Sequence, residues 1–299
     1  MPANPYAEPV IAWFDRHARD LPWRRPEASP WAILVSEIML QQTPVARVLP
    51  AYEAWLRRWP TPAALAADTP GEAVRQWDRL GYPRRALNLH AIARTLVERH
   101  DGRVPSSYDD LLALPGIGPY TAATVASFAF RGRHAVLDTN VRRVLARLVG
   151  AEEHPPKTRT STEQALAESL LPDDPPRAAR WAAASMELGA LVCTSRSPEC
   201  GACPVVGVCA WHNAGRPAYT GPPRRGQRYA GTDRQVRGRL LAVLRSSDTP
   251  VHHATLEPAW SDPVQRERAL DALVADGLVD PLPNGTYALP GHTGDAHCG

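Results

Sequence analysis

Four of the five cysteines lie close together in the sequence, at Cys193, Cys200, Cys203 and Cys209. Their spacing, C-x6-C-x2-C-x5-C, contains one close pair, whereas zinc ribbons and fingers usually contain two. Four thiolates on one loop suit a 4Fe-4S cluster, in which each cysteine binds a different iron. A zinc site or unmetallated thiols remain alternatives. Residues 1–20 carry no export signal, so disulfides are the less favoured interpretation.

A glycine-containing turn is predicted between two helices, in the segment LPGIGPYTA that begins at Leu114. Gly116 and Gly118 allow a sharp turn, and Pro119 opens the second helix. The amides at the start of that helix form an anion cradle, where we expect a phosphate. Taken alone, such a segment is more often a tight helix hairpin with no ligand.

Two carboxylates complete the set of residues that could do chemistry. Glu37 lies in SEIMLQQT, in a helix predicted over 31–42, and Asp138 lies in LDTNVRR, twenty residues after Gly118. Taken alone, Glu37 is an acid on a helix surface and Asp138 is the N-cap of the next helix. The order of the motifs changes both interpretations, because the hairpin, the aspartate and the four cysteines follow one another in the order found in one family.

Residues 9 to about 212 resemble the helix-hairpin-helix DNA glycosylases, in the branch that holds endonuclease III and MutY. Within that branch, three segments are similar to the MutY-type adenine DNA glycosylases, which act opposite 8-oxoguanine. These segments are LPWR at 21–24, SEIMLQQT at 36–43 and LGY at 80–82.

The resemblance implies an all-α, two-lobed fold with the active cleft between the lobes. A six-helix lobe with the hairpin is expected over 24–133, and an iron-sulfur cluster lobe over 1–23 and 134–215. The implied cofactor is a 4Fe-4S cluster held by the four cysteines of 193–209.

The resemblance also assigns separate roles to the two acids. Cleavage of the N-glycosidic bond requires protonation of adenine and builds oxocarbenium charge on the deoxyribose. Glu37 is implied to be the acid, with its pKa raised by burial, and Asp138 the ionised carboxylate that stabilises or traps the sugar cation. Asn140 is implied to hold the geometry of the reaction centre.

The resemblance further implies that the enzyme does not cut the DNA strand. Lyases of this superfamily place a lysine after the hairpin and attack the sugar as a Schiff base. Here that position is Tyr120, and the only lysine of the chain is Lys157, in a predicted loop. We therefore expect a monofunctional glycosylase that leaves an abasic site.

The remaining candidate residues are expected to bind DNA. By resemblance, Gln42 and Tyr82 form the intercalating pair beside the orphan purine, and Trp23 and Arg24 line the adenine pocket. Arg196, inside the cysteine loop, is a further candidate for placing positive charge beside DNA.

The chain departs from the family pattern in three places. Pro83 follows Tyr82 where many relatives have a bulky residue, and Ala183 stands where relatives often place a glutamate or glutamine near the adenine. The well-described members end in a domain resembling the MutT fold, which reads 8-oxoguanine. Only about 84 residues follow residue 215, and they lack the acidic signature of that fold.

The C-terminal residues predict a different module. We interpret 216–232 as a basic linker, either a solvated tether or an extended segment along phosphates. Over 233–299 we expect a small winged-helix-like α+β domain, from helices at 236–245 and 263–277, a short helix at 254–259 and a hairpin at Asn284-Gly285.

Composition sets the wider expectations. A formal charge of +3 permits but does not prove a nucleic-acid partner, and no apolar run is long enough to span a membrane. We expect a cytoplasmic monomer, associated with the nucleoid if bacterial, that acts on double-stranded DNA with an A:8-oxoguanine or A:G mispair. The alternatives are a mismatch thymine or uracil glycosylase of the same fold, or a non-enzymatic iron-sulfur DNA-binding regulator.

Overall fold

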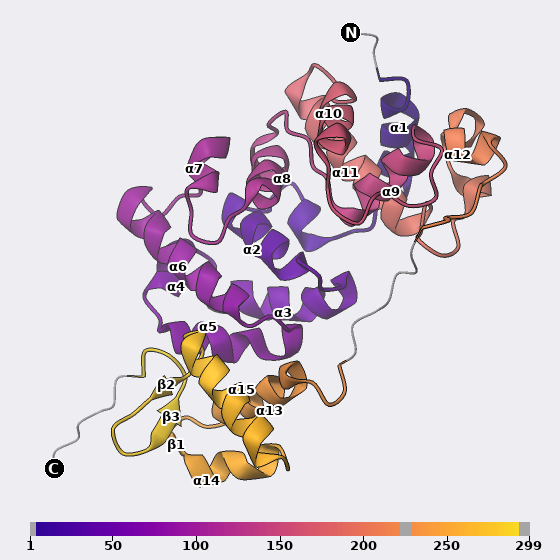
Figure 1. Ribbon diagram of the computed structural model, residues 1–299. Coiled ribbons are helices and arrows are strands. Elements are labelled where there is room, and N and C mark those ends of the chain that lie inside the picture. The colour runs from indigo at the N-terminus through magenta and orange to yellow at the C-terminus, as the bar shows by residue number, and fades with distance from the viewer. Residues whose placement is uncertain (1–3, 222–228, 293–299) are drawn as a thin grey trace. The chain divides into compact units, whose positions relative to one another are not determined.

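The computed structural model describes residues 4–221 and 229–292, which are mainly helical with one small sheet near the C-terminus (Figure 1). The chain divides into two compact units. Unit 1 contains residues 1–34, 105–113 and 117–223, and unit 2 contains residues 35–104, 114–116 and 224–299. The expected fold class is confirmed, whereas the domain boundaries drawn from the sequence stay predictions. No helix of the described residues is long and apolar enough to cross a membrane.

Unit 1 is built from α-helices and short 3-10 helices. They are α1 (Ala7–His17), η1 (Pro22–Arg24), α7 (Tyr108–Leu112), α8 (Pro119–Phe130), α9 (Thr139–Leu148), α10 (Ser161–Ser169), α11 (Pro175–Leu191), η3 (Cys200–Ala202), η4 (Val206–Val208) and α12 (Ala210–Asn213). The division between the units falls within α2 (Pro30–Leu40).

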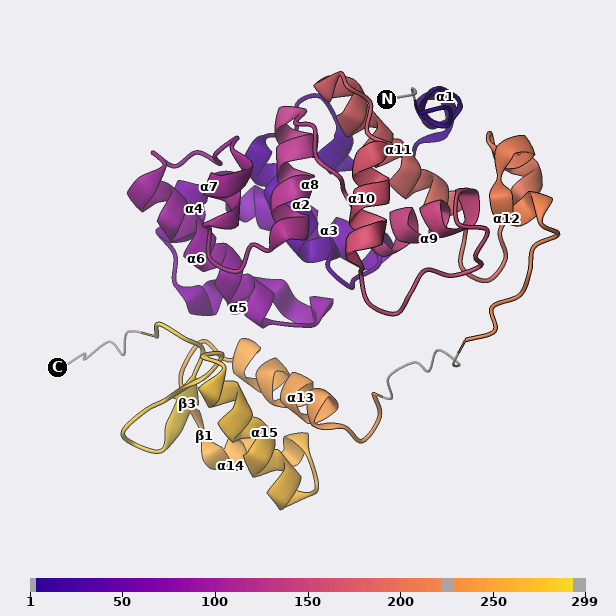
Figure 2. The same ribbon diagram turned by 45° about the horizontal axis from the view of Figure 1, so that its top comes forward.

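The core of unit 1 joins α1, α9 and α11, which the views in Figures 1 and 2 show near one another. Phe14, Leu145 and Trp181 are buried there, one from each helix. Helices α9 and α11 approach closely at Gly189, because a Cβ on that glycine would lie 2.7 Å from the Cβ of Asn140. Three of the four clustered cysteines pack against the same core, so the cysteine loop is built onto α9 and α11.

Unit 2 contains a helical part and the C-terminal domain. The helical part comprises α3 (Val45–Arg58), α4 (Pro62–Ala66), α5 (Pro70–Trp77), η2 (Asp78–Leu80) and α6 (Arg84–Arg99). Three fully buried tryptophans centre this part: Trp55 lies 4.6 Å from Trp59 and 5.7 Å from Trp77, measured between ring centroids in edge-on contacts. Such edge-on aromatic pairs contribute stability beyond that from the burial of apolar area.

The C-terminal domain has the element order of a winged helix. It contains α13 (Asp233–Arg245), β1 (Val251–His252), α14 (His253–Leu256), η5 (Glu257–Ala259), α15 (Pro263–Ala275), β2 (Asp280–Pro281) and β3 (Thr286–Ala288). The antiparallel sheet has the order β1-β3-β2, with Val251 opposite Tyr287 and Asp280 opposite Ala288. Gly285 adopts a φ of 72°, which confirms the hairpin turn predicted at Asn284-Gly285.

The predicted linker lies partly outside the described residues, since residues 222–228 are not among them. Its first residues contact unit 1: the indole nitrogen of Trp211 donates to the carbonyl of Pro217 (2.9 Å), and the amide of Tyr219 donates to Glu153 (2.6 Å). These residues of 216–232 are therefore attached to the cysteine-bearing unit.

Candidate functional site

Asp138 is the N-cap of α9, as its sequence context predicts. Its Oδ1 accepts a hydrogen bond from the amide of Val141 (2.6 Å), and its Oδ2 accepts one from the side-chain amide of Asn140 (2.7 Å). The capping bond satisfies an amide that the helix itself cannot pair. These two bonds hold the carboxylate in a single orientation.

The surroundings of Asp138 act on its charge in opposite directions. Burial raises its pKa above the ordinary value of 3.8, and the hydrogen bonds from Val141 and Asn140 and the charge of Arg143 partly offset that effect. The ionised form of Asp138 therefore depends on Asn140 and Val141 as donors.

Arg143, one turn along α9, connects this carboxylate to the cysteine loop. Its Nη2 donates to Oδ1 of Asn140 (2.8 Å) and to the carbonyl of Gly189 (2.7 Å), and its Nε donates to the carbonyl of Cys193 (2.8 Å). Both ends of the Asn140 amide are therefore occupied, with the nitrogen on Asp138 and the oxygen on Arg143. Asn140 cannot rotate its amide without losing both bonds.

Arg147, a further turn along α9, organises the cysteine loop itself. Its side chain is among the largest that are fully buried, at 1% exposure. Nη1 donates to the carbonyl of Thr194 (2.7 Å) and lies 3.4 Å from the sulfur of Cys193, while the guanidinium stacks 4.7 Å from the ring of Trp211. The positive charge reaches a position beside the first of the four thiols.

The four thiols are close enough for their charges to interact. Burial, together with the charges of Cys193, Cys209 and Cys200, raises the pKa of Cys203 to about 11. Among the described residues no three metal-binding side chains form a single-ion site. A four-iron cluster does not need one, because each thiolate binds a different iron. Four thiols, one for each iron, are the donor set that a 4Fe-4S cluster takes.

Arg196 extends from the same loop. Its side chain is exposed, and it forms no hydrogen bond or ion pair within the described part of the chain. Its position is compatible with the predicted contact to DNA, which stays a prediction.

The turn between α7 and α8 confirms the predicted need for a glycine at Gly116 but not at Gly118. Gly116 has a φ of 73°, which strains any residue with a side chain, and a Cβ there would lie 2.6 Å from the side-chain nitrogen of Asn88 and displace it. Gly118 has an ordinary extended conformation with open space around its Cα, so the turn does not require a glycine there. Tyr120, half-buried, occupies the first turn of α8, where lyases carry a lysine.

In unit 2, the residues predicted to flip and protonate the base lie on or beside α2. Glu37 is buried, at 6% exposure. Gln42, two residues after the helix, and Tyr82, after η2, are both exposed and have left-handed backbones, with φ values of 53° and 49°. Residues other than glycine rarely adopt this backbone conformation, and such strained residues concentrate at functional sites. Asp78 (φ 41°) and Gly81 (φ 82°) also have positive φ values, so the segment that leads to Tyr82 turns sharply.

Arg85 on α6 holds both of these turns. Its Nη1 donates to the carbonyls of Ile38, Met39 and Gln41, and its Nη2 donates to the hydroxyl of Thr43 and the carbonyl of Gly81, at 2.6–3.0 Å. Burial lowers the pKa of its guanidinium to about 10. One buried cation thus caps the end of the helix that carries Glu37 and ties it to the turn that carries Tyr82.

In unit 1, Arg24 is held by a buried acid. Its Nη2 donates to Oε2 of Glu187 (2.9 Å), and Arg19 binds the same carboxylate with three further bonds, two from its side chain (2.8 and 2.6 Å) and one from its backbone amide (3.0 Å). Nη1 of Arg24 is buried without a partner among the described residues. Trp23 beside it is buried as well. An unpaired buried donor is costly, so this nitrogen is available for a ligand.

Glu187 gives a testable pH dependence of stability. Burial raises its pKa, but the hydrogen bonds from Arg19 and Arg24 outweigh burial and lower the pKa from 4.5 to about 2. The ion pairs therefore stabilise the fold above about pH 4.5, and this contribution is lost as the pH falls toward 2. We expect Glu187→Gln to reduce the free energy of unfolding by about 3 kcal/mol at neutral pH. Urea unfolding at a series of pH values checks this.

The matched control for that variant is Glu168→Gln, on the exposed end of α10. It should leave the stability unchanged. A Glu187→Gln variant whose stability depends on acid pH as steeply as that of the parent would contradict the assignment.

The sequence-predicted residues fall into two groups. Unit 1 holds Trp23, Arg24, Gly118, Tyr120, Asp138, Asn140, Arg196 and the four cysteines, and unit 2 holds Glu37, Gln42, Tyr82 and Gly116. Reasoning from the sequence missed the four charged residues that support them: Arg85, Arg143, Arg147 and Glu187. A partial signal existed for Arg143, because residues three apart share a face of a helix and Arg143 follows Asn140 at that spacing.

Comparisons with known proteins agree with these features. Residues 35–172 match the model of the HhH-GPD superfamily base excision DNA repair proteins, and residues 193–209 match the iron-sulfur binding domain of endonuclease III. The solved structure of a thermostable thymine-DNA glycosylase shares the fold, with a TM-score of 0.62 and 26% identity, over 70% of this chain and 95% of that one.

Two relatives match along nearly the whole chain. The adenine DNA glycosylase of Mycolicibacterium smegmatis is 55% identical over 94% of this chain and 95% of its own length. That of Mycobacterium tuberculosis is 52% identical, over 94% and 92%. The C-terminal domain therefore lies within the matched length of these relatives. The chain belongs to the adenine DNA glycosylase family, and it carries the iron-sulfur domain of the endonuclease III type.

Proposed function

We propose that the protein removes adenine mispaired with 8-oxoguanine or guanine, by hydrolysis of the N-glycosidic bond, and leaves an abasic site. The observation that carries the proposal is the orientation of Asp138. Both of its oxygens accept hydrogen bonds, from Val141 and Asn140, and Asn140 is itself fixed by Arg143. A carboxylate held in this way can stabilise positive charge without reorganising during the reaction.

The two acids divide the reaction between them. Glu37 gives a proton to N7 of adenine, and the bond between C1′ and N9 breaks with its electron pair leaving on the base. Asp138 stabilises the resulting sugar cation, water adds at C1′, and the proton of that water passes to a carboxylate. The burial of Glu37 supports its role, because burial favours the protonated form of a carboxyl group.

DNA is the partner of the family, and the described residues supply its contacts. The unpaired Nη1 of Arg24 is the donor proposed to meet the extruded adenine. Gln42 and Tyr82 enter the duplex at the mispair. The amides that open α8 and the exposed Arg196 contact the phosphate backbone.

Cys193, Cys200, Cys203 and Cys209 hold the iron-sulfur cluster in this proposal. When bound, the cluster supplies a four-point cross-link of the loop between α11 and α12. The chain's own residues connect that loop to the reaction centre, since Arg143 bonds to both Cys193 and Asn140.

A set of single-turnover reactions tests the substrate. Duplexes carry A opposite 8-oxoguanine, A opposite G, or T or U opposite G, and each is developed with alkali. We expect release of adenine only, and its loss in Glu37→Gln. Release of T or U alone would move the assignment to a mismatch thymine glycosylase, and no release from any duplex would favour a DNA-binding regulator.

A second expected result concerns the DNA strand. Because Tyr120 replaces the lysine of the lyases and Lys157 is the only lysine, the product strand should stay intact until alkali is added. Borohydride added during the reaction should trap no protein-DNA adduct, with a lysine-bearing lyase as the positive control. An efficient adduct would contradict the monofunctional mechanism.

A cytoplasmic location and a monomeric state are also part of the proposal, and both rest on the sequence alone.

A further inference from the structure

The C-terminal domain packs against the helical segment of unit 2 that leads to Tyr82. Arg245, the last residue of α13, donates to the carbonyls of Val74 (2.9 Å) and Asp78 (2.6 Å), and Arg75 donates back to the carbonyl of Arg245. These carbonyls belong to α5 and η2, directly before the Gly81-Tyr82 turn. The C-terminal domain therefore contacts the base of the turn.

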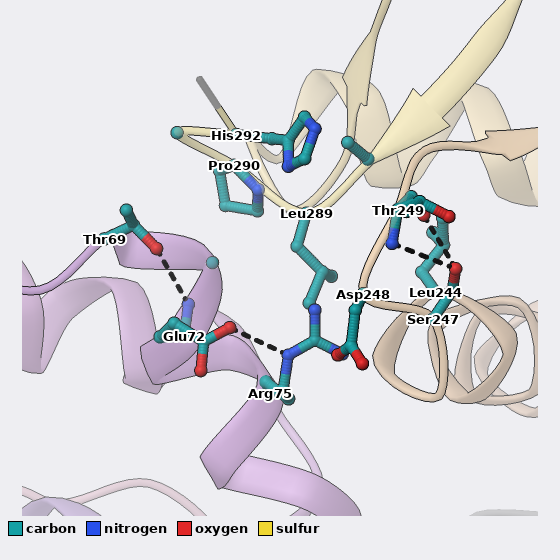
Figure 3. Close-up of a pocket in the computed structure, with 13 residues that line it drawn as sticks. Thr69, Glu72, Arg75, Leu244, Ser247, Asp248, Thr249, Leu289, Pro290 and His292 are labelled. Atoms are coloured by element: carbon teal, nitrogen blue, oxygen red, sulfur yellow. Dashed lines mark hydrogen bonds and ion pairs between the residues drawn. The ribbon is translucent and has the colours of Figure 1, made fainter. Parts of the chain in front are cut away.

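The C-terminal domain also packs closely against the start of α5. A Cβ on Gly71 of α5 would lie 2.7 Å from the carbonyl oxygen of Pro290. Figure 3 shows the small pocket that remains between the two parts, lined by Glu72 and Arg75 from α5 and by Leu244, Asp248 and His292 from the C-terminal domain. Its cations and acids are largely paired with one another, so we assign no ligand to it.

The first turn of α13 reaches Tyr82 itself. The guanidinium carbon of Arg234 lies 4.3 Å from the centre of the Tyr82 ring, within the range of a cation-π contact. Arg234 is exposed and forms no ion pair or hydrogen bond among the described residues, and its other aromatic neighbour, the ring of Tyr229, is more distant, at 6.0 Å. Tyr82 is 37% exposed, and the only other cation over its ring among the described residues is Arg85, whose guanidinium carbon lies farther from the ring centre, at 5.4 Å.

The charges of the domain argue against the usual use of a winged helix. In helix-turn-helix proteins the second helix of the motif enters the major groove and needs free basic residues. Here that helix is α15, whose Arg266 is buried and whose Arg268 is paired with Asp233, while Glu267 and Asp271 remain on it. The exposed arginine beside Tyr82, Arg234, lies on α13 instead.

We propose that Arg234 is a positioning residue for Tyr82. Through this contact the winged-helix domain sets how Tyr82 enters the DNA beside the orphan purine. The cation lies over the aromatic ring and holds it in the orientation in which it enters the duplex. This inference rests on the proposed role of Tyr82 in the intercalating pair. It gives the C-terminal domain a function that requires neither a MutT-like fold nor a base contact from α15.

A double-mutant cycle in the full-length protein tests the inference. The variants are Arg234→Ala, Tyr82→Leu and the pair, and the readouts are the single-turnover rates on A:8-oxoguanine and A:G duplexes. A 2-aminopurine beside the orphan purine reports unstacking by its fluorescence. We expect Arg234→Ala to lower both the rate and the fluorescence rise about two- to fivefold, the effect of a cation-π contact at an exposed site.

Two matched variants separate position from charge. Arg239→Ala removes a cation from the same helix that lies over Trp260 rather than Tyr82, and it should leave the rate unchanged. Arg234→Lys keeps a cation over the ring and should restore most of the loss. If Arg234→Lys behaved like Arg234→Ala, the contact would not be a cation-π contact and the inference would fail.

The outcomes distinguish the two proposals. In the Tyr82→Leu background, Arg234→Ala should cause no further loss. A loss of rate that persists there would overturn the inference. If Arg234→Ala also lowered the slope of log K against log salt concentration by about one, Arg234 would be a phosphate contact instead. If Tyr82→Leu behaved like the parent, the role of Tyr82 itself would be wrong. Retained adenine release in all variants would leave the glycosylase assignment intact.

Discussion

An Asp138→Asn variant is expected to lose adenine removal by about 10³-fold or more while keeping its fold. Asparagine caps a helix as well as aspartate does, so the bond to the amide of Val141 and the start of α9 should survive. The other oxygen, however, becomes an NH2 group that faces the NH2 group of Asn140. Asn140 cannot turn to accept from it, because its own oxygen is held by Arg143.

The measurement is a single-turnover time course on an A:8-oxoguanine duplex, with DNA binding and thermal unfolding measured beside it. The matched control is Asp174→Asn, which changes the N-cap aspartate of α11, whose side chain likewise accepts from a backbone amide, of Arg177 (3.0 Å). That variant should have full activity. An Asp138→Asn enzyme within tenfold of the parent would show that the carboxylate charge is not needed.

The local features of the site could be predicted from the sequence because short-range rules determine them. Asp138 is predicted as an N-cap by its place before an amphipathic run, and the cap bond confirms this. The turn at Gly116 and the hairpin at Gly285 follow from a residue type that tolerates positive φ. Gly118 shows the limit of that rule, since a glycine in the pattern need not have a strained backbone.

The supporting residues could not be predicted in the same way, because their partners are distant in the sequence. Arg85 bonds to carbonyls more than forty residues earlier, and Arg143 bonds to Cys193, fifty residues later. An arginine on a polar helix reads as solvated unless the fold that buries it is known. In a chain whose basic residues are nearly all arginine, composition cannot distinguish the buried ones from the exposed ones.

The winged helix illustrates both cases. Its helices and its turn follow from periodicity and from Asn284-Gly285, and the structure confirms them. The attachment through Arg245 does not follow from any local pattern, although burial lowers the pKa of that arginine to about 10. What the domain contacts is a property of the tertiary structure alone.

Arg85→Ala is expected to reduce both stability and activity. The change removes five hydrogen bonds and leaves buried carbonyls at the end of α2 without a donor. We expect a loss of about 3–5 kcal/mol in the free energy of unfolding, measured by urea denaturation. The control is Arg94→Ala on the same helix, where an exposed pair with Glu98 should contribute less than about 1 kcal/mol.

Arg85→Ala should also slow the reaction of the molecules that remain folded, because one guanidinium sets the positions of two turns. Without it, the turn of Gln42 and the turn of Tyr82 can relax from their left-handed conformations independently. A displacement of about 1 Å at a reacting group costs on the order of 10²-fold in rate, and Glu37 lies one residue before the first carbonyl that Arg85 binds. We therefore expect about a 10²-fold slower single turnover under conditions where the variant is fully folded.

Arg85→Lys should recover stability better than activity, because one ammonium keeps the charge but cannot span both turns. Equal recovery of both would mean that Arg85 serves the fold alone.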